Sequence, residues 1–347
     1  MLFVIILVAL IWGLGHMLRM PIVARLNMIG LLYVAVLAVH VVLPDGHPLR
    51  AAIGGSAGEW AVLGGIAAIV WVYFKGLGRL RTRVLPENRK TDGPDSSGLE
   101  LERNARHIVL REIGGPGQKR LKEASILVIG AGGLGAPALQ YLAAAGVGTI
   151  GVIDDDRVEN SNLQRQVIHT DARIGMPKVF SAEAAMKAQN PFVTVRPYHR
   201  RLTADIARDL FSDYDLILDG TDDTDTRYLV NETAVALGLP LISAAISQWE
   251  GQISVFDPLR GAPCYCCIFP EPAAAGLAPS CAEGGVLGPL PGVMGSTMAV
   301  EAIKVISGAG EPLFGRMMIY DAQYGDVRTI SAKRRSDCPV CKSVGRS

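Results

Sequence analysis

A glycine-rich turn between a short apolar segment and an Ala-rich segment constrains the fold of this chain more than any other feature. The run Ser125–Ile129 predicts a strand, and it leads directly into Gly130-Ala-Gly-Gly-Leu-Gly135. Residues Leu134–Ala145 then predict a helix, and Thr149–Asp154 predicts a second strand that ends in a carboxylate. This order is the pattern of a βαβ nucleotide-binding unit.

The residue types in this unit indicate an anionic ligand. Glycines let backbone N–H groups approach phosphate, and a helix N-terminus favours negative charge. We therefore expect Gly130, Gly132, Gly133 and Gly135 to surround nucleotide phosphates, and Asp154 to hold ribose hydroxyls. By itself the pattern indicates an adenine nucleotide, for which NAD is the default.

Further segments alternate between strand and helix patterns. Strands are predicted over Asp215–Asp219, Pro240–Ile246, Gln252–Phe256 and Arg316–Tyr320, and helices over Lys178–Gln189, Thr224–Leu237 and residues 293–307. Such alternation predicts an α/β fold with a doubly wound, mostly parallel, Rossmann-like sheet.

The charged residues that follow the second strand do not suit a dehydrogenase. They form the run Ser161-Asn162-Leu163-Gln164-Arg165-Gln166, then Lys178, and later Gly220-Thr221-Asp222-Asp223 at the end of a predicted strand. Cations and a metal-binding carboxylate around one phosphate chain favour nucleotidyl transfer over hydride transfer. The alternative is a set of solvated loop charges.

Two cysteine pairs predict a structural zinc site. Cys264 with Cys267 and Cys338 with Cys341 are CxxC pairs about 70 residues apart. Four thiolates suit tetrahedral zinc, and the site would tie a C-terminal subregion back to the domain. A redox CxxC and coincidentally buried cysteines are the alternatives. Cys266 is a possible substitute ligand.

Cys281 stands apart from these pairs, after a segment rich in Pro and Ala. An isolated cysteine on a loop can be a nucleophile or a sulfur acceptor. The equally weighted alternative is a small buried apolar side chain.

The N-terminal segment, residues 1–75, is far more apolar than the rest. Only five charged side chains fall in residues 1–74, at Arg19, Arg25, Asp45, Arg50 and Glu59. Three apolar runs predict two to three transmembrane helices. The first run is the weakest candidate for a membrane span. A buried helical core and a cleavable signal peptide are the alternatives.

A basic linker is predicted over residues 76–102, between these helices and an ATP-binding domain over residues 103–343. Basic residues in the first loop and after the third run put the catalytic domain on the cytoplasmic side of the cell (inner) membrane, in a multi-pass arrangement. The net charge is only +1, which argues against nucleic-acid binding by bulk charge.

Over about residues 99–343 the chain strongly resembles the MoeB/ThiF branch of the ubiquitin-activating superfamily. The resemblance rests on the segments already quoted, together with Arg103-Asn-Ala-Arg106-His107 and with Cys281 to Ser296. The last segment is most similar to the molybdopterin-synthase adenylyltransferases. The family adenylates the C-terminal glycine of small ubiquitin-like sulfur carriers ending in Gly-Gly, with ATP and Mg²⁺.

The resemblance implies roles for individual residues. Asn162, Arg165 and Lys178 would bind phosphates, Asp222 would hold Mg²⁺, and the four paired cysteines would hold Zn²⁺. Ser161, Leu163, Gln164 and Asp223 belong to the matched nucleotide motifs. Arg106 would reach a neighbouring subunit's site, which implies a homodimer. Cys281 would handle an acyl or sulfur intermediate together with a sulfur-donor protein.

Three departures from the family pattern stand out. Arg103-Asn-Ala-Arg106-His107 replaces Arg-Tyr-x-Arg-Gln. Asp223 replaces an Asn and adds negative charge near the triphosphate. Only six residues follow Cys341 in the sequence, so we expect no sulfurtransferase domain there. Alternative functions are activation of a thiamine-pathway carrier or of a tRNA carboxylate, an NAD-dependent oxidoreductase, and a non-catalytic membrane scaffold.

Overall fold

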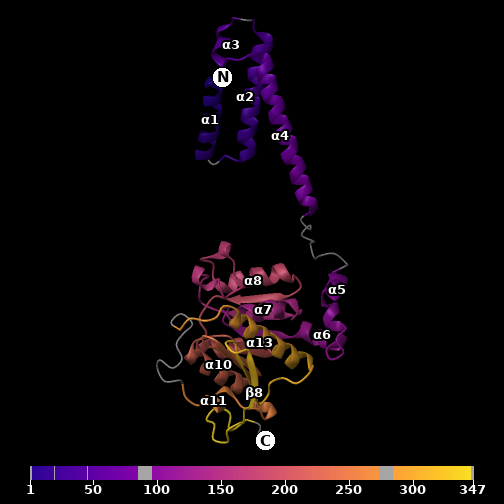
Figure 1. The fold of residues 1–347 in the computed structure, drawn as a ribbon, viewed down its shortest axis with the longest axis vertical. Helices are drawn as coiled ribbons and strands as arrows, with labels where there is room; N and C mark the ends of the chain where they lie inside the picture. The colour runs from indigo at the N-terminus through magenta and orange to yellow at the C-terminus, as the bar shows by residue number, and fades with distance from the viewer. Residues whose placement is uncertain (1, 19, 45, 85–95, 273–283, 345–347) are drawn as a thin grey trace. The chain divides into compact units, whose positions relative to one another are not determined.

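The computed structural model describes residues 2–18, 20–44, 46–84, 96–272 and 284–344. The chain divides into two compact units, Met1–Lys90 and Thr91–Ser347, which are described separately (Figure 1).

The first unit contains only helices, namely α1 (Leu2–Met17), α2 (Ile22–Val42), α3 (Pro48–Ile53) and α4 (Ala57–Val84). Its small core consists of Val4, Val36, Ile53 and Trp60. Tyr33 reinforces that core, because its hydroxyl donates a hydrogen bond of 2.7 Å to the carbonyl of Trp60. Among the described residues of the unit, most large apolar side chains are exposed.

One described helix, rather than the two to three predicted, is long and apolar enough to cross a membrane. The stretch Ala24–Val42 has 19 residues and a mean hydropathy of 1.8. The apolar stretches Leu2–Gly15 and Ala57–Val70 are shorter than the roughly 20 residues of a straight span. Although α4 continues to Val84, its C-terminal part carries Lys75, Arg79, Arg81 and Arg83, which shorten its apolar stretch.

The second unit is a three-layer α/β domain. Its helices are α5 (Ser96–Ile108), α6 (Gly114–Glu123), α7 (Gly135–Ala144), α8 (Lys178–Gln189), α9 (Ala204–Phe211), α10 (Thr224–Leu237), α11 (Tyr265–Ile268) and α13 (Pro289–Ser307). Its strands are β1 (Ser125–Ile129), β2 (Thr149–Ile153), β3 (Thr194–Tyr198), β4 (Leu216–Asp219), β5 (Leu241–Ile246), β6 (Glu250–Phe256), β7 (Arg316–Asp321) and β8 (Asp326–Ser331).

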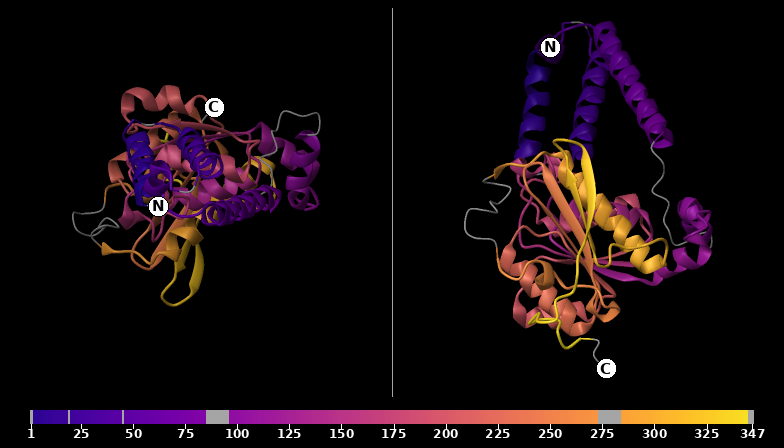
Figure 2. Two further views of the ribbon diagram at one scale, coloured as in Figure 1. Left: turned by 90° about the horizontal axis from the view of Figure 1, so that it is seen from above. Right: turned by 60° about the horizontal axis from the view of Figure 1, so that its bottom comes forward.

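All eight strands form one sheet in the order β3-β2-β1-β4-β5-β6-β7-β8. The first five run parallel, with Ile126 of β1 opposite Ile150 of β2 and Leu216 of β4. The last three are antiparallel, and they lie side by side in orange to yellow in Figure 2. The sequence order reverses between β1 and β4, so a crevice is expected beyond the carboxyl ends of these strands.

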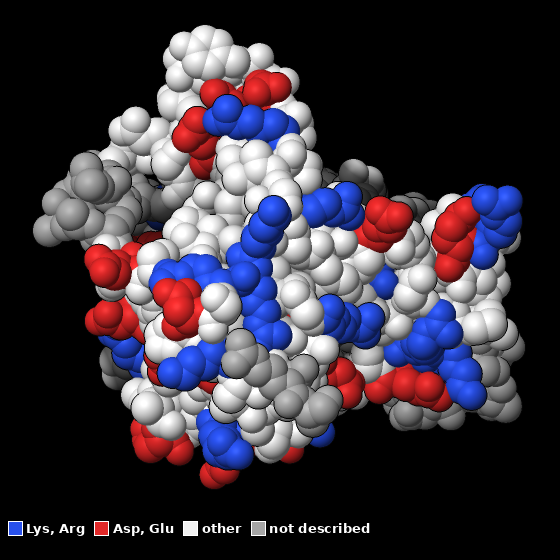
Figure 3. All heavy atoms as spheres, turned by 90° about the horizontal axis from the view of Figure 1, so that it is seen from below, with Lys and Arg blue, Asp and Glu red and all other residues white. Residues whose placement is uncertain are grey.

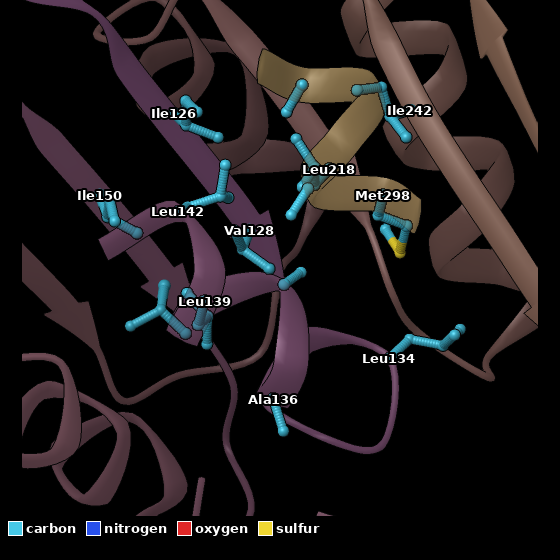
Figure 4. Packing of buried hydrophobic residues seen from close by; sticks show 14 of the residues in the cluster. Ile126, Val128, Leu134, Ala136, Leu139, Leu142, Ile150, Leu218, Ile242 and Met298 are labelled. Atoms are coloured by element: carbon cyan, nitrogen blue, oxygen red, sulfur yellow. The ribbon is translucent and has the colours of Figure 1, made fainter. Parts of the chain in front are cut away.

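Alternate strand residues serve two different cores. Ile126 and Val128 of β1 pack with α7, α8 and α13 on one face of the sheet, where Leu139, Leu142 and Met298 meet them (Figure 4). Leu127 and Ile129 pack with α9 and α10 on the opposite face. Because both faces are covered, the central strands are continuous apolar runs in their interior instead of alternating with polar residues.

The surface of the molecule carries both signs of charge. Lys and Arg side chains lie among Asp and Glu side chains on the face seen from below, with several basic side chains near its centre (Figure 3). This mixture agrees with the net charge of +1.

The predicted doubly wound, mostly parallel sheet is confirmed. The predicted helices over Lys178–Gln189 and Thr224–Leu237 match α8 and α10 residue for residue. Other elements were not predicted, among them α6, β3, α9, α11 and β8. The predicted linker, residues 76–102, includes the end of α4, which extends to Val84, and the start of α5, which begins at Ser96.

Candidate active site

A cavity of about 530 Å³ lies beyond the carboxyl ends of β1, β2 and β4, where the strand order reverses. Its size is within the range of small-molecule sites. Acidic and basic side chains both line it, and they come from the segments that follow β2, β3 and β4, from the first turns of α8 and α10, and from Glu271.

The glycine turn forms one wall of this cavity. Gly130 has φ of +90°, a conformation that favours glycine, and a Cβ on Gly135 would lie 1.9 Å from the carbonyl oxygen of Gly130. A Cβ on Gly132 would meet nothing closer than 3.7 Å. Gly130 and Gly135 are therefore required by the turn itself, whereas Gly132 leaves room for a ligand to approach the backbone.

Asp154 joins this turn to the end of β2. Its Oδ2 accepts a hydrogen bond of 2.8 Å from the backbone N–H of Ala131, and its Oδ1 accepts one of 2.8 Å from Asp156. Burial raises the pKa of Asp154, although the positive charge of Lys178 and the two backbone donors oppose that shift. A carboxylate has about four acceptor positions, so two remain for ligand hydroxyls.

Three polar side chains approach the cavity from the segment after β2. Asn162 Oδ1 accepts a hydrogen bond of 3.3 Å from the backbone of Glu159, which fixes the 3₁₀ turn Asn160–Asn162. Arg165 is held by a hydrogen bond of 3.0 Å from its guanidinium to the carbonyl of Ser161. Lys178, the first residue of α8, is buried and forms an ion pair of 2.7 Å with Asp156.

A buried polar network fixes the loop after β4. Asp219 accepts hydrogen bonds of 2.8 Å from the hydroxyls of Ser243 and Thr221, and it pairs with Arg227 at 3.3 Å. Arg227 also donates to the backbone carbonyl of Thr221. Because Thr221 is bound at both its hydroxyl and its carbonyl, the next residue, Asp222, is presented at the cavity.

The two carboxylates after this loop differ in their surroundings. Asp222 is exposed, and no cationic side chain pairs with it among the described residues. Asp223 is the N-cap of α10, where Oδ2 accepts a hydrogen bond of 3.0 Å from the backbone of Thr226. Hydrogen bonds from Thr226, together with Arg201 at 3.4 Å, lower the pKa of Asp223.

Most of the expected nucleotide-binding residues line this one cavity: Gly130, Gly132, Gly133, Asp154, Asn162, Arg165, Lys178, Asp222 and Asp223. Gly135, Ser161, Leu163 and Gln164 do not line it. Gln164 instead lies against Gly288, at the start of α13. Arg106 is exposed on α5 and does not line the cavity of its own chain. Cys281 lies outside the described residues.

Several cavity residues were not identified from the sequence, among them Arg200, Arg201 and Arg227. Asp219, which forms an ion pair with Arg227, was also not predicted as a site residue. An acid at the last position of an otherwise apolar strand was the available signal for Asp219, since a buried carboxylate requires a partner. Arg200 and Arg201 follow β3, and that strand was itself not predicted.

His169 supports the glycine turn through a contact with Ala131. Its Nε2 lies 2.9 Å from the carbonyl oxygen of Ala131, and its Nδ1 lies 2.9 Å from the hydroxyl of Ser181. A carbonyl can only accept, so Nε2 carries the proton and Nδ1 accepts from Ser181. Burial lowers the pKa of His169, and the nearby cations Lys178 and Arg173 act in the same direction.

The four paired cysteines converge at one buried point, as predicted. The Sγ atoms of Cys264 and Cys267 lie 3.8 Å apart, and those of Cys264 and Cys338 lie 3.5 Å apart. All four Sγ atoms lie within 4.8 Å of one another. Tetrahedral zinc with bonds of about 2.3 Å separates its sulfurs by about 3.8 Å, so the cluster fits Zn²⁺.

Cys266 does not belong to this cluster. Its Sγ accepts a hydrogen bond of 3.3 Å from the side-chain amide of Asn231, on α10. The same Asn231 accepts a hydrogen bond of 2.9 Å from the backbone of Tyr265. Cys266 therefore anchors α11 to α10.

Comparison with known proteins identifies a family over most of the second unit. The model of the ThiF family matches residues 104–340. The chain is 50% identical over 246 residues to the sulfur carrier protein adenylyltransferase of Thermus thermophilus, which covers 70% of this chain and 91% of that protein.

Two other relatives are much longer than the segment that aligns with this chain. Identity is 52% over 243 residues to the probable adenylyltransferase/sulfurtransferase MoeZ of Mycobacterium tuberculosis, covering 69% of this chain and 62% of the relative. Identity is 48% over 243 residues to adenylyltransferase and sulfurtransferase MOCS3 of Bos taurus, and the alignment covers 70% of this chain and 53% of the relative. The chain thus spans less than two thirds of the length of these two proteins.

Solved structures share the fold. Escherichia coli MccB with MccA-N7isoASN aligns with a TM-score of 0.58 at 23% identity, over 65% of this chain and 69% of that one. PaaA aligns with a TM-score of 0.59 at 21% identity, over 84% of this chain and 88% of the PaaA chain.

Proposed function

The chain belongs to the ThiF family, and from this premise we propose that it uses ATP to adenylate the C-terminal glycine of a small ubiquitin-like sulfur carrier. The names of its relatives identify the enzyme class as adenylyltransferase. We further propose the small subunit of molybdopterin synthase as the carrier, with a thiamine-pathway carrier as the alternative.

The observation that supports this reaction best is the convergence of Arg165, Lys178 and Asp222 at the carboxyl ends of the parallel strands. These two cations and the exposed carboxylate of Asp222 suit a chain of phosphates and its counter-ion. A hydride-transfer site does not require this set of charges.

The proposed chemistry is a displacement at phosphorus. An oxygen of the carrier's terminal carboxylate forms a bond to the α-phosphorus of ATP, and the bond to the pyrophosphate oxygen breaks. The carboxylate is already ionised at neutral pH, so the step requires no general base. Arg165 and Lys178 would neutralise charge on the reacting and leaving phosphates, and Asp154 would orient the ribose.

Asp222 is the residue that we propose to hold Mg²⁺. Its carboxylate is exposed at the cavity and is not paired with a cation among the described residues, so its oxygens suit a hard divalent ion. Such an ion supplies positive charge to the phosphates. The cysteine cluster would hold Zn²⁺ as a closed structural site with no open coordination position.

The proposal is tested by ATP–pyrophosphate exchange with purified carriers that end in Gly-Gly. Asp222→Ala and Arg165→Ala are expected to reduce exchange by about 100-fold or more with the fold intact. Asp209→Ala, which removes an exposed acid on α9, is the matched control. Near-normal exchange in both site variants would contradict the proposed mechanism.

We place Cys281 in a step after adenylation, in which an acyl or sulfur intermediate is handled with a separate sulfur-donor protein. Cys281→Ala is therefore expected to keep full pyrophosphate exchange. Loss of exchange in a folded Cys281→Ala protein would show that this residue acts earlier.

We propose a homodimer in which Arg106 acts in the site of the partner. The side chain is exposed and lies outside the cavity of its own chain, so it is available to another copy.

We also propose that the first unit anchors the enzyme to the cell membrane, with the catalytic domain in the cytoplasm. The stretch Ala24–Val42 and the many exposed apolar side chains of α1, α2 and α4 support an anchor. A cytoplasmic domain has access to ATP and keeps its zinc-site thiols reduced.

A further inference from the structure

Two residues from distant parts of the sheet meet across the cavity. Arg201 follows β3, and Asp223 follows β4, and the sheet places β2 and β1 between those strands. The guanidinium of Arg201 nevertheless lies 3.4 Å from Oδ2 of Asp223. Both residues line the cavity.

Asp223 cannot turn away from the cavity without a cost to the fold. The oxygen that pairs with Arg201 also accepts hydrogen bonds from the backbone and the hydroxyl of Thr226, and so caps α10. The carboxylate is therefore a fixed negative charge beside Asp222. Whereas Asp222 is free to hold a divalent cation, the capping oxygen of Asp223 is already bound to protein donors.

A fixed carboxylate opposes the entry of a polyphosphate. Two like charges about 4 Å apart repel each other by about 1 kcal/mol even in bulk water, and by more next to a protein. Among the described residues, Arg201 is the cation that pairs with Asp223. Its neighbour Arg200 also lines the cavity, but no ion pair joins Arg200 to this carboxylate.

We propose that Arg201 is a positioning residue that neutralises Asp223 and thereby makes the cavity compatible with a polyphosphate. This inference rests on the proposed nucleotide site. Arg201 acts through Asp223, not by direct contact with the nucleotide, so its importance depends on whether position 223 is charged.

Asparagine at position 223 provides the background for a test. Asn caps a helix about as well as Asp, so Asp223→Asn removes the charge and keeps α10 in place. With a neutral cap, removal of Arg201 leaves no uncompensated charge.

The test is a double-mutant cycle in ATP–pyrophosphate exchange with the full chain. Arg201→Ala is expected to raise the KM for ATP about three- to fivefold with kcat nearly unchanged, since both partners are partly exposed. In the Asp223→Asn background the same change is expected to leave KM unaltered. Arg201→Lys, which keeps the charge, should restore much of the wild-type KM.

The matched control is Arg200→Ala, whose effect on KM should be the same in both backgrounds. Coupling that weakens as salt increases would support the proposal further. Equal effects of Arg201→Ala in the two backgrounds would overturn it in favour of direct contact with ATP. No effect in either background would overturn it as well.

Failure of the proposed function gives a different result. If the wild-type chain shows no exchange with any carrier, the four proteins of the cycle can be compared by calorimetric titration with ATP. These four are the wild type, Arg201→Ala, Asp223→Asn and the double variant. Coupling between positions 201 and 223 in ATP affinity would then support the charge pair, and its absence would contradict it. Thermal unfolding of each variant separates these effects from a loss of structure.

Discussion

Nζ of Lys178 lies 2.7 Å from Oδ2 of Asp156, and the Lys178 side chain is only 7% exposed whereas that of Asp156 is 65% exposed. The Lys178 ammonium is thus a buried charge that lines the cavity, and its partner is a hydrated carboxylate that can turn toward solvent. A phosphate oxygen can take the place of that carboxylate without leaving a buried charge unpaired.

Lys178→Met should therefore separate activity from stability. Exchange is expected to fall about 100- to 1,000-fold, because the site loses a preorganised positive charge. The free energy of unfolding should change by less than about 1 kcal/mol, since Met fills the space and Asp156 stays hydrated. Exchange kinetics and urea denaturation measure the two effects. Lys187→Met, an exposed lysine on the same helix, is the control and should keep exchange.

Arg106 provides a test of the dimer. Arg106→Ala and Asp222→Ala are each expected to be inactive, but a mixture of the two variants should regain about a quarter of wild-type exchange. The gain arises because half of the sites in a mixed dimer combine an intact Asp222 with an intact Arg106. A mixture of Asp222→Ala with Arg165→Ala should stay inactive. If the first mixture also stays inactive, Arg106 does not act in the partner's site.

The cysteine cluster predicts a metal-dependent fold. Cys338→Ala should reduce bound zinc from one ion per chain to nearly none, and it should lower the free energy of unfolding by more than about 3 kcal/mol. Metal analysis and thermal unfolding measure these changes. Cys266→Ala is the matched control, because Cys266 bonds to Asn231 outside the cluster and should retain zinc. Zinc loss in Cys266→Ala but not in Cys338→Ala would reverse the assignment of ligands.

His169 predicts a pH dependence of stability. Burial lowers its pKa in the folded state below the ordinary value of 6.5. Below pH 6.5 the unfolded chain therefore binds a proton that the folded chain does not, and stability falls as the pH falls, until the folded pKa is passed. The slope is at most about 1.4 kcal/mol per pH unit.

Comparison with His169→Gln isolates this contribution from other titrating groups. The difference in the free energy of unfolding between wild type and variant should shrink between pH 7.5 and pH 5.5, because only the wild type loses stability from this site. A difference that is constant with pH would contradict the prediction.

The membrane arrangement is tested with reporter fusions. A fusion after Ser347 should report a cytoplasmic location, and a fusion within Leu43–Arg50 should report the opposite side of the membrane. The first result follows from the basic residues Lys75, Arg79, Arg81 and Arg83, which precede the catalytic domain, because Lys and Arg near a membrane span favour the cytoplasmic side. A periplasmic signal after Ser347 would contradict the proposed location and, with it, the use of cytosolic ATP.

Local sequence determined those elements whose pattern is complete within a few residues. The turn Gly130–Gly135 could be predicted because positive φ at Gly130 and close packing at Gly135 exclude other residues. The central strands were found as apolar runs because a parallel sheet covered on both faces buries every side chain. The CxxC pairs indicated a convergence because four cysteine sulfurs in two such pairs suit one tetrahedral metal ion.

Tertiary structure decided what depends on contacts between distant segments. The edge strand β8 is exposed along its length, so it lacks the apolar pattern of the central strands, and it pairs with β7 only because the sheet presents a free edge there. The pairing of Arg201 with Asp223 and of Asp219 with Arg227 depends on which loops meet beyond the strand ends. Local sequence encodes conformational preference and burial, whereas charge pairing at the cavity is set by strand order, which brings the loops after β3 and β4 together.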